Sequence, residues 1–219
     1  MSIFVLKTIA CITMFLDHIK YANPIFNNSI TIYLGRISFP LYAFMIVEGY
    51  FHTSDIKKYY KRLIILAIVS QIPFMLFRKL VGEEKLLDAV FTLLLGMVCI
   101  TICEKTNKSW FALLISGIII YLGKLIHVDY GWYGVALIFV FYLGRENKYL
   151  LTMLYTILTV SYFMYREVNI LDAKVYFAFH FIPLILVLLY NGKKGKDMKK
   201  FFYLFYPVHM LLVYLISLI

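Results

Sequence analysis

Long apolar runs follow one another along the whole chain, separated by short loops that are rich in lysine and arginine. A helix that crosses a bilayer needs roughly 20 mostly apolar residues, within a range of about 17–25. The runs are continuous rather than alternating, which favours α-helices over strands. They predict about nine membrane helices, at 3–19, 32–51, 60–78, 88–104, 109–126, 130–144, 149–165, 174–190 and 201–219.

The run at 130–144 is the weakest of these predictions. It is short, and it opens on an aromatic and glycine-rich stretch at 130–134 that could lie at the interface or be partly unwound. If this segment does not cross the membrane, every later segment changes side.

Composition supports a membrane protein. Hydrophobic residues make up 63% of the 219 residues, charged residues 16%, and the mean hydropathy is +0.82. Soluble domains have roughly 45–50% apolar and about 25% charged residues. We therefore expect an all-α fold, a polytopic transmembrane helix bundle. Residues 1–219 should form a single integral membrane domain, located in the cell membrane.

The net charge of +10 would suggest a nucleic-acid partner in a soluble protein. Here the cations lie in loops between apolar runs, where membrane topology and anionic lipid explain them, and no nucleic acid is expected. They are about twice as frequent in the loops on the side of the N-terminus as in the opposite loops. This bias predicts a cytoplasmic N-terminus and, with nine crossings, a C-terminus outside.

Ionisable groups inside apolar helices are costly and therefore candidates for function. Asp17 and His18 lie toward the outer end of the first predicted helix, and Arg36 opens the second on the same side. A histidine beside a carboxylate could act as a general base or acyl carrier, or the two could cap the helix at the interface. Arg36 could neutralise Asp17, either as a structural clamp or as a substrate contact.

A second set of candidates would face the cytosol. Glu48 is twelve residues after Arg36, which places it ~18 Å farther along a helix axis, and a run of cations follows it. Clustered lysine and arginine side chains suit the phosphates of a cofactor, although positive-inside topology also explains them. The candidate cofactor-binding residues are Glu48, Lys57, Lys58, Lys61, Arg62, Lys193, Lys194 and His209.

His180 and His209 both lie in apolar helices, and a single buried histidine is more often a packing residue than a catalyst. No metal is expected, because histidines and carboxylates do not gather on one predicted face.

The sequence resembles the TraX family of multi-pass membrane proteins. Four regions carry the resemblance: 6–19, which ends in Asp17-His18-Ile19; 35–53, which begins with Gly35-Arg36-Ile37; Ser70-Gln71-Ile72-Pro73-Phe74; and 202–209, which ends in Tyr206-Pro207-Val208-His209. They span nearly the whole chain, and the similarity is looser from about 80 to 175.

The resemblance implies a membrane acetyltransferase that takes its acetyl group from cytosolic acetyl-CoA. It implies that His18 is the base or acyl carrier, that Asp17 orients it, and that Arg36 stabilises the carboxylate or an oxyanion. The family is typified by a protein that acetylates the N-terminus of pilin, but the acceptor here could be an amine or hydroxyl on a peptide or an envelope glycan. A proton-coupled transporter and a noncatalytic scaffold are the alternative functions.

Overall fold

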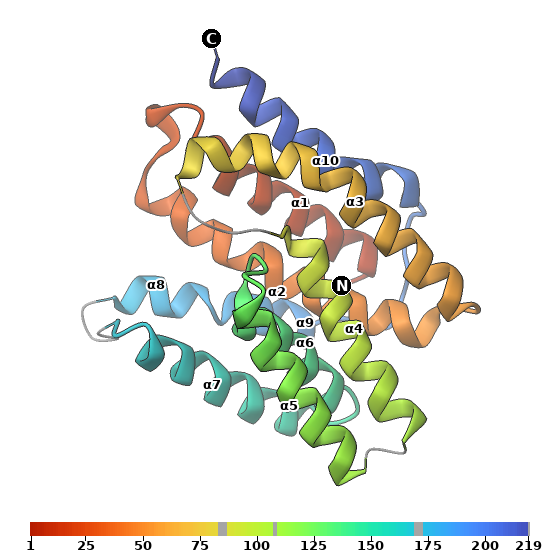
Figure 1. Ribbon diagram of the computed structural model, residues 1–219. Helices are drawn as coiled ribbons and strands as arrows, with labels where there is room; N and C mark the ends of the chain where they lie inside the picture. Colours follow the sequence, from red (N-terminus) through yellow and green to blue (C-terminus); the bar gives the residue numbers. More distant parts are fainter. Residues whose placement is uncertain (83–86, 107–108, 169–172, 219) are drawn as a thin grey trace. The chain divides into compact units, whose positions relative to one another are not determined.

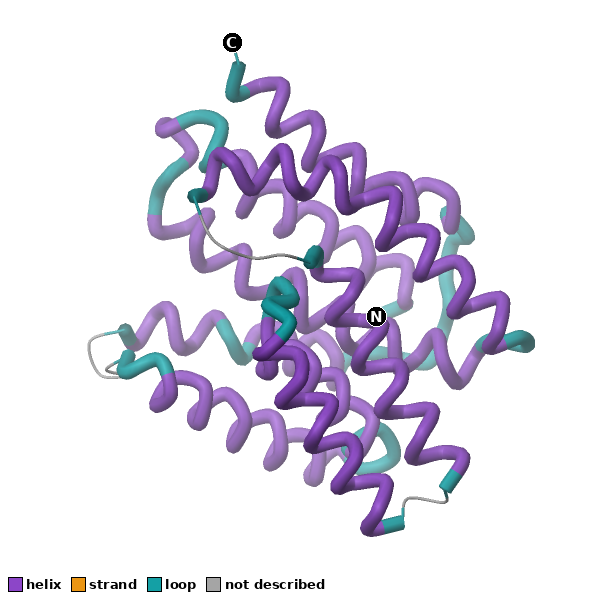
Figure 2. The backbone as a smooth tube through the Cα atoms, in the orientation of Figure 1, coloured by secondary structure: helices purple, strands orange, loops and turns teal. Residues whose placement is uncertain are grey.

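The computed structural model describes residues 1–82, 87–106, 109–168 and 173–218. Over these residues the backbone consists of helices and connecting loops (Figure 2), with a single bridge between Leu87 and Val128. The helices are α1 Ile3–Ile19, α2 Ser29–His52, α3 Ile56–Val81, α4 Ala89–Lys105, α5 Trp110–Leu125, α6 Gly131–Leu143, α7 Lys148–Tyr165, α8 Lys174–Phe179, α9 Ile182–Leu188 and α10 Lys199–Ile216, with a short 3₁₀ turn, η1, at Pro24–Phe26.

Each predicted run contains a helix, but the number of crossings is less clear than the sequence suggested. Within the described residues, three helices are long and apolar enough to cross a membrane: α2, α3 and α10. The others do not meet both conditions. For example, α6 has 13 residues and is therefore ~20 Å long, whereas the hydrocarbon layer is about 30 Å thick.

The run at 174–190 was predicted to be one helix and is two. The first, α8, ends at Phe179, and α9 begins at Ile182 with Pro183 in its first turn. A proline ring crowds the carbonyl four residues earlier in a helix and kinks or breaks it, and that carbonyl belongs to Phe179. The break therefore coincides with the residue that Pro183 crowds.

The contacts along the chain divide it into two compact units, and α2 and α3 each contribute to both. Unit 1 comprises Met1–Tyr42, Ile68–Glu83 and Asn169–Ile219, and unit 2 comprises Ala43–Ala67 and Glu84–Val168. That both units belong to one membrane domain stays a prediction.

In unit 1, α1 packs along α10 (Figure 1). A cluster of buried apolar side chains joins them to the end of α3; its members are Ile19, Phe74, Phe77, Met210 and Val213. At the start of α1, the amide of Ile3 donates to the carbonyl of Lys193 at 2.9 Å, and that of Phe4 donates to Lys194 at 3.1 Å. The basic loop before α10 therefore lies beside the beginning of α1.

In unit 2, α6 is the central helix and packs against α4, α5 and α7. Its side chains from Tyr133 to Tyr142 are all buried. A methyl group at Gly96 of α4 would overlap Ile138 of α6, so this glycine allows the two helices to approach closely. The uniformly apolar sequence of α6 is explained by its burial among neighbouring helices.

Candidate functional site

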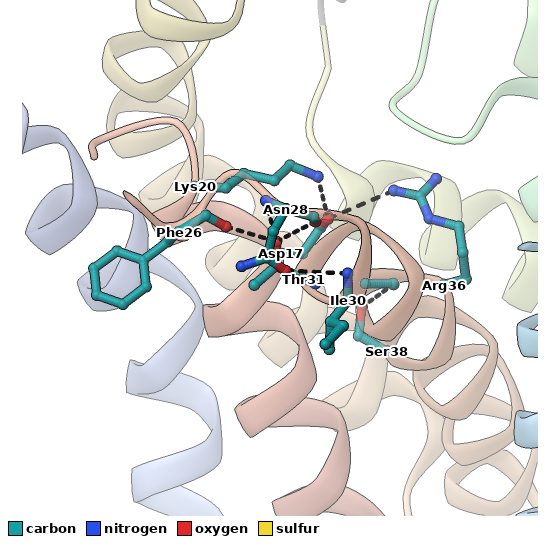
Figure 3. A network of polar contacts seen from close by, with 9 residues as sticks. Asp17, Lys20, Phe26, Asn28, Ile30, Thr31, Arg36 and Ser38 are labelled. Atoms are coloured by element: carbon teal, nitrogen blue, oxygen red, sulfur yellow. Dashed lines mark hydrogen bonds and ion pairs between the residues drawn. The ribbon is translucent and has the colours of Figure 1, made fainter. Parts of the chain in front are cut away.

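Asp17 lies at the centre of a buried charge cluster in unit 1 (Figure 3). The ammonium group of Lys20 donates to Asp17 Oδ1 at 2.5 Å, and Arg36 Nη2 lies 3.6 Å from the same oxygen. The side chains of Lys20 and Asp17 are only 7% and 12% exposed. The expected proximity of Arg36 and Asp17 is therefore found, and Lys20 is a partner that the sequence analysis missed.

Close packing of α2 against α1 brings this cluster together. A methyl group at Gly35 would overlap the carboxyl group of Asp17, so only glycine allows the helices to approach this closely. The start of α2 is fixed by Asn28, whose side-chain oxygen accepts from the amides of Ile30 and Thr31 at 3.1 Å each (Figure 3). Arg36 therefore projects from α2 about two turns after this anchored start.

His18 pairs with a histidine from the far end of the chain. Its Nδ1 lies 2.8 Å from Nε2 of His209 on α10, and Nδ1 of His209 lies 2.9 Å from the carbonyl oxygen of Phe205. His209 is 2% exposed, whereas His18 is half-buried. The ring of Phe77 on α3 packs 4.7 Å from that of His18. The pair thus has a buried member and a more accessible one.

The role of Asp17 in orienting His18 stays a prediction, and the two side chains have different partners in the structure. Asp17 contacts Lys20 and Arg36, while the Nδ1 atom of His18 contacts His209. Consecutive side chains on a helix point about 100° apart, so neighbours in the sequence face different partners. The structure instead brings His18 together with His209, which had been grouped with the cofactor-binding loops.

Aromatic side chains lie beside Arg36. Its guanidinium group is 5.9 Å from the ring centre of Tyr176 on α8. Tyr33 of α2 packs against both Tyr176 and Phe179, at centroid distances of 5.8 and 5.4 Å. Arg36 is 29% exposed at this position, and it is therefore available to a ligand as well as to Asp17.

Glu48 forms a second buried charge cluster, in unit 2. Nε of Arg145 donates to Glu48 Oε1 at 3.3 Å, and Nδ1 of His52 lies 3.6 Å from Oε2. The guanidinium group of Arg145 also lies 4.3 Å from the ring centre of Phe51. Glu48 was grouped with the cations at 57–62 as a candidate cofactor-binding residue. Its partner is instead Arg145, which comes from the loop after α6 and carries no local signal of this role.

The cations that follow Glu48 lie at the start of α3 and are exposed: they are Lys57, Lys58, Lys61 and Arg62. Lys58 pairs with Asp55, whose side chain accepts from the amide of Lys58 at 3.0 Å and lies 3.3 Å from its ammonium group. The backbone hydrogen bond from Lys58 holds the pKa of Asp55 below its usual value. These cations are therefore accessible to an anionic ligand.

Lys193 and Lys194 are also exposed, in the loop before α10. Lys194 donates to Asp197 at 2.6 Å, and this bond lowers the pKa of Asp197. The loop is bonded to the start of α1, while His18 is near its end, ~22 Å along the helix by its rise. The structure therefore separates these lysines from His209, with which they had been grouped.

Within the described residues, no three His, Cys, Asp or Glu side chains are arranged to hold a metal ion. The site consists of the charge cluster at Asp17 and the histidine pair in unit 1, with a separate cluster at Glu48 in unit 2.

Comparisons with known proteins agree with the resemblance of the four sequence regions. Residues 2–217 match the family described as TraX protein. A probable fimbrial assembly protein, FimC of serogroup H1, from Dichelobacter nodosus is 27% identical over 234 aligned positions, which cover 97% of this chain and 94% of the relative. No solved structure matches the chain.

Proposed function

Because the chain belongs to the TraX family, we propose that it is a membrane acetyltransferase that transfers an acetyl group from acetyl-CoA to an amine or hydroxyl acceptor. The observation that carries the proposal is the position of His18, which is half-buried and paired with His209 in the same unit as the ion-paired Asp17 and Arg36. A partly exposed imidazole suits the proton transfers of acyl transfer.

His18 is the general base of the proposed reaction. The acceptor nitrogen attacks the thioester carbonyl carbon, a C–N bond forms, and His18 takes the proton that the nitrogen loses. The C–S bond then breaks, and the leaving thiolate receives this proton from His18. His18 ends in its original protonation state and the proton has moved from the acceptor nitrogen to the CoA thiol, so no further reactant is needed.

Arg36 is the electrophilic group. Its guanidinium is positively charged under all ordinary conditions and could stabilise the negative charge that develops on the carbonyl oxygen. Asp17 holds Arg36 in place through its Oδ1 atom, and the ammonium group of Lys20 donates to the same oxygen. Arg36→Lys should therefore lower kcat more than it raises KM. The compact ammonium group of lysine cannot contact Asp17 and the carbonyl oxygen at once, as the planar guanidinium group can.

Acetyl-CoA carries phosphate groups, which the exposed basic clusters at 57–62 and 193–194 could bind. We expect the double variant Lys193→Gln/Lys194→Gln to raise KM for acetyl-CoA several-fold with little change in kcat, and to reduce its dependence on salt. Lys105→Gln, an exposed cation at the end of α4, is the matched control. An unchanged KM in this variant and in Lys57→Gln/Lys58→Gln would contradict a role of these loops in binding the donor.

The proposed topology has several crossings of the cell membrane, a cytoplasmic N-terminus and an acceptor that enters from outside. It rests on the distribution of cations between alternate loops. Single cysteines placed at 57 and 193 should react with an impermeant maleimide only after the membrane is opened. Labelling of either position in intact cells would contradict the orientation.

The relative from Dichelobacter nodosus is described as a fimbrial assembly protein, so the N-terminal amine of a pilin-type peptide is the first acceptor to test. Mass spectrometry of peptides, glycans and envelope polymers from cells with and without the gene should show an acetylated species that disappears with the gene. If no acetylated species disappears, the acetyltransferase proposal fails, and transport of a small molecule becomes the hypothesis to test.

A further inference from the structure

Three histidines of the chain use their Nδ1 atom in the same way. Nδ1 lies 2.8 Å from the carbonyl oxygen four residues earlier in His52, and 2.9 Å from it in His180 and His209. A carbonyl oxygen only accepts hydrogen bonds, so Nδ1 must carry the hydrogen in each case. In a neutral ring, Nε2 is then the nitrogen with the lone pair.

This rule fixes the direction of the hydrogen bond between the paired histidines. Nε2 of neutral His209 is an acceptor, and it lies 2.8 Å from Nδ1 of His18. Nδ1 of His18 must therefore donate, which leaves the lone pair of neutral His18 on its Nε2 atom. The backbone of α10 thus determines, through His209, which nitrogen of His18 can take a proton.

The position of His209 is itself tightly held. Its ring lies parallel to that of Phe205, with centroids 4.8 Å apart and an interplanar angle of 6°. It is 2% exposed, and the next residue, Met210, belongs to the apolar cluster that joins α1, α3 and α10. His209 cannot turn away without disturbing that cluster.

We propose that His209 is a positioning residue that holds His18 in the tautomer with Nδ1 protonated and Nε2 ready to accept the acceptor's proton. The catalytic role of this tautomer rests on the proposed acetyl transfer. The hydrogen bonds that set the tautomer do not depend on that function. When His18 gains a proton on Nε2, its Nδ1–H bond to His209 is retained and becomes charge-assisted, and therefore stronger. The pair needs no rearrangement during the reaction.

Nitrogen NMR of the full chain in nanodiscs, labelled with ¹⁵N-histidine, tests the tautomer directly. The signals of His18 are identified by their loss in His18→Asn, and the exposed His127 serves as the reference for an imidazole in solvent. In the wild type, above the pH at which His18 is charged, we expect the hydrogen of His18 on Nδ1. A hydrogen on Nε2 would overturn the proposal, whatever the enzyme's activity proves to be.

Two variants of His209 separate positioning from packing. His209→Gln offers a carbonyl oxygen near the position of Nε2 and should keep His18 in the same tautomer. His209→Leu fills similar space without an acceptor, so a fraction of His18 should move its hydrogen to Nε2. If His18 keeps the same tautomer in His209→Leu, then His209 does not set it.

The same variants give the kinetic result. We expect His209→Leu to lower kcat for acetyl transfer by about 10²-fold with little change in KM, and His209→Gln to restore it to within a few-fold. His127→Asn is the control that keeps the wild-type rate. Equal loss in the Gln and Leu variants would overturn the role of His209, whereas absence of acetyl transfer in the wild type would contradict only the proposed function.

Discussion

Asp17 and Glu48 are buried carboxylates with similar neighbours and different connections. Each lies near an arginine and a histidine, but Asp17 is bound by Lys20 and Arg36, whereas Glu48 is bound by Arg145 and approached by His52. Two cations contact Oδ1 of Asp17, and the histidine that follows it in the sequence pairs with another histidine. The same types of residue thus place the histidine in a separate pair in one region and beside the carboxylate in the other.

The comparison predicts a larger loss of stability at Asp17 than at Glu48. Asp17→Asn leaves the buried ammonium of Lys20 without a counter-charge and should lower the free energy of unfolding by roughly 3–5 kcal/mol. Glu48→Gln should cost less, about 1.5–3 kcal/mol, because Arg145 is 27% exposed and also contacts Glu146. Unfolding by SDS in mixed micelles measures both.

A second variant shows whether the loss at Asp17 comes from the uncompensated cation. Adding Lys20→Met to Asp17→Asn removes that charge, so the double variant should be more stable than Asp17→Asn alone. Additive losses from the two substitutions would mean that the pair does not explain the effect.

Adding a methyl group where two helices approach closely should give the next largest loss of stability. A methyl group in Gly35→Ala meets the carboxyl of Asp17, and separating α1 from α2 should cost about 1–3 kcal/mol and reduce acetyl transfer. Gly49, beside Glu48, faces the ring of Tyr59, so Gly49→Ala should lower stability alone. Gly117→Ala in α5 meets no atom within 4 Å and should stabilise by about 0.5–1 kcal/mol. Equal activity in the Gly35 and Gly49 variants would contradict this distinction.

Lysine substitutions of Arg36 and Arg145 should give the smallest difference in the free energy of unfolding. Arg145 makes a hydrogen bond and stacks on Phe51, whereas Arg36 reaches Asp17 at 3.6 Å and Tyr176 at 5.9 Å. Arg145→Lys should therefore lower the free energy of unfolding by about 1 kcal/mol, and Arg36→Lys by less. The reverse order in the same SDS titration would show that Arg36 is the stronger structural clamp.

The sequence predicted the helices well because apolar runs report burial or lipid contact directly. The prediction of one helix at 174–190 was wrong, because a proline in an apolar run does not by itself show whether the helix breaks there. Pro40, Pro73 and Pro207 all lie inside continuous helices. Only Pro183 coincides with a break. The number of crossings was harder still, because a short buried helix such as α6 is as apolar as one that faces lipid.

The candidate site was predicted in part. The pairing of Arg36 with Asp17 followed from their shared depth, and Lys20 could have been found from its spacing of three residues after Asp17. The pairing of His18 with His209 joins residues 191 positions apart, and no helical period connects them. Arg145 is equally remote from Glu48. Tertiary packing alone brings such partners together.

The role of His18 is tested most directly by acetyl transfer in the purified protein in nanodiscs, with labelled acetyl-CoA and a peptide that has a free N-terminal amine. We expect the wild type and His127→Asn to label the peptide at equal rates. We expect His18→Asn to be slower by at least about 10²-fold, the usual contribution of a general base. Transfer that continues unchanged in His18→Asn would contradict the central claim that His18 is the base.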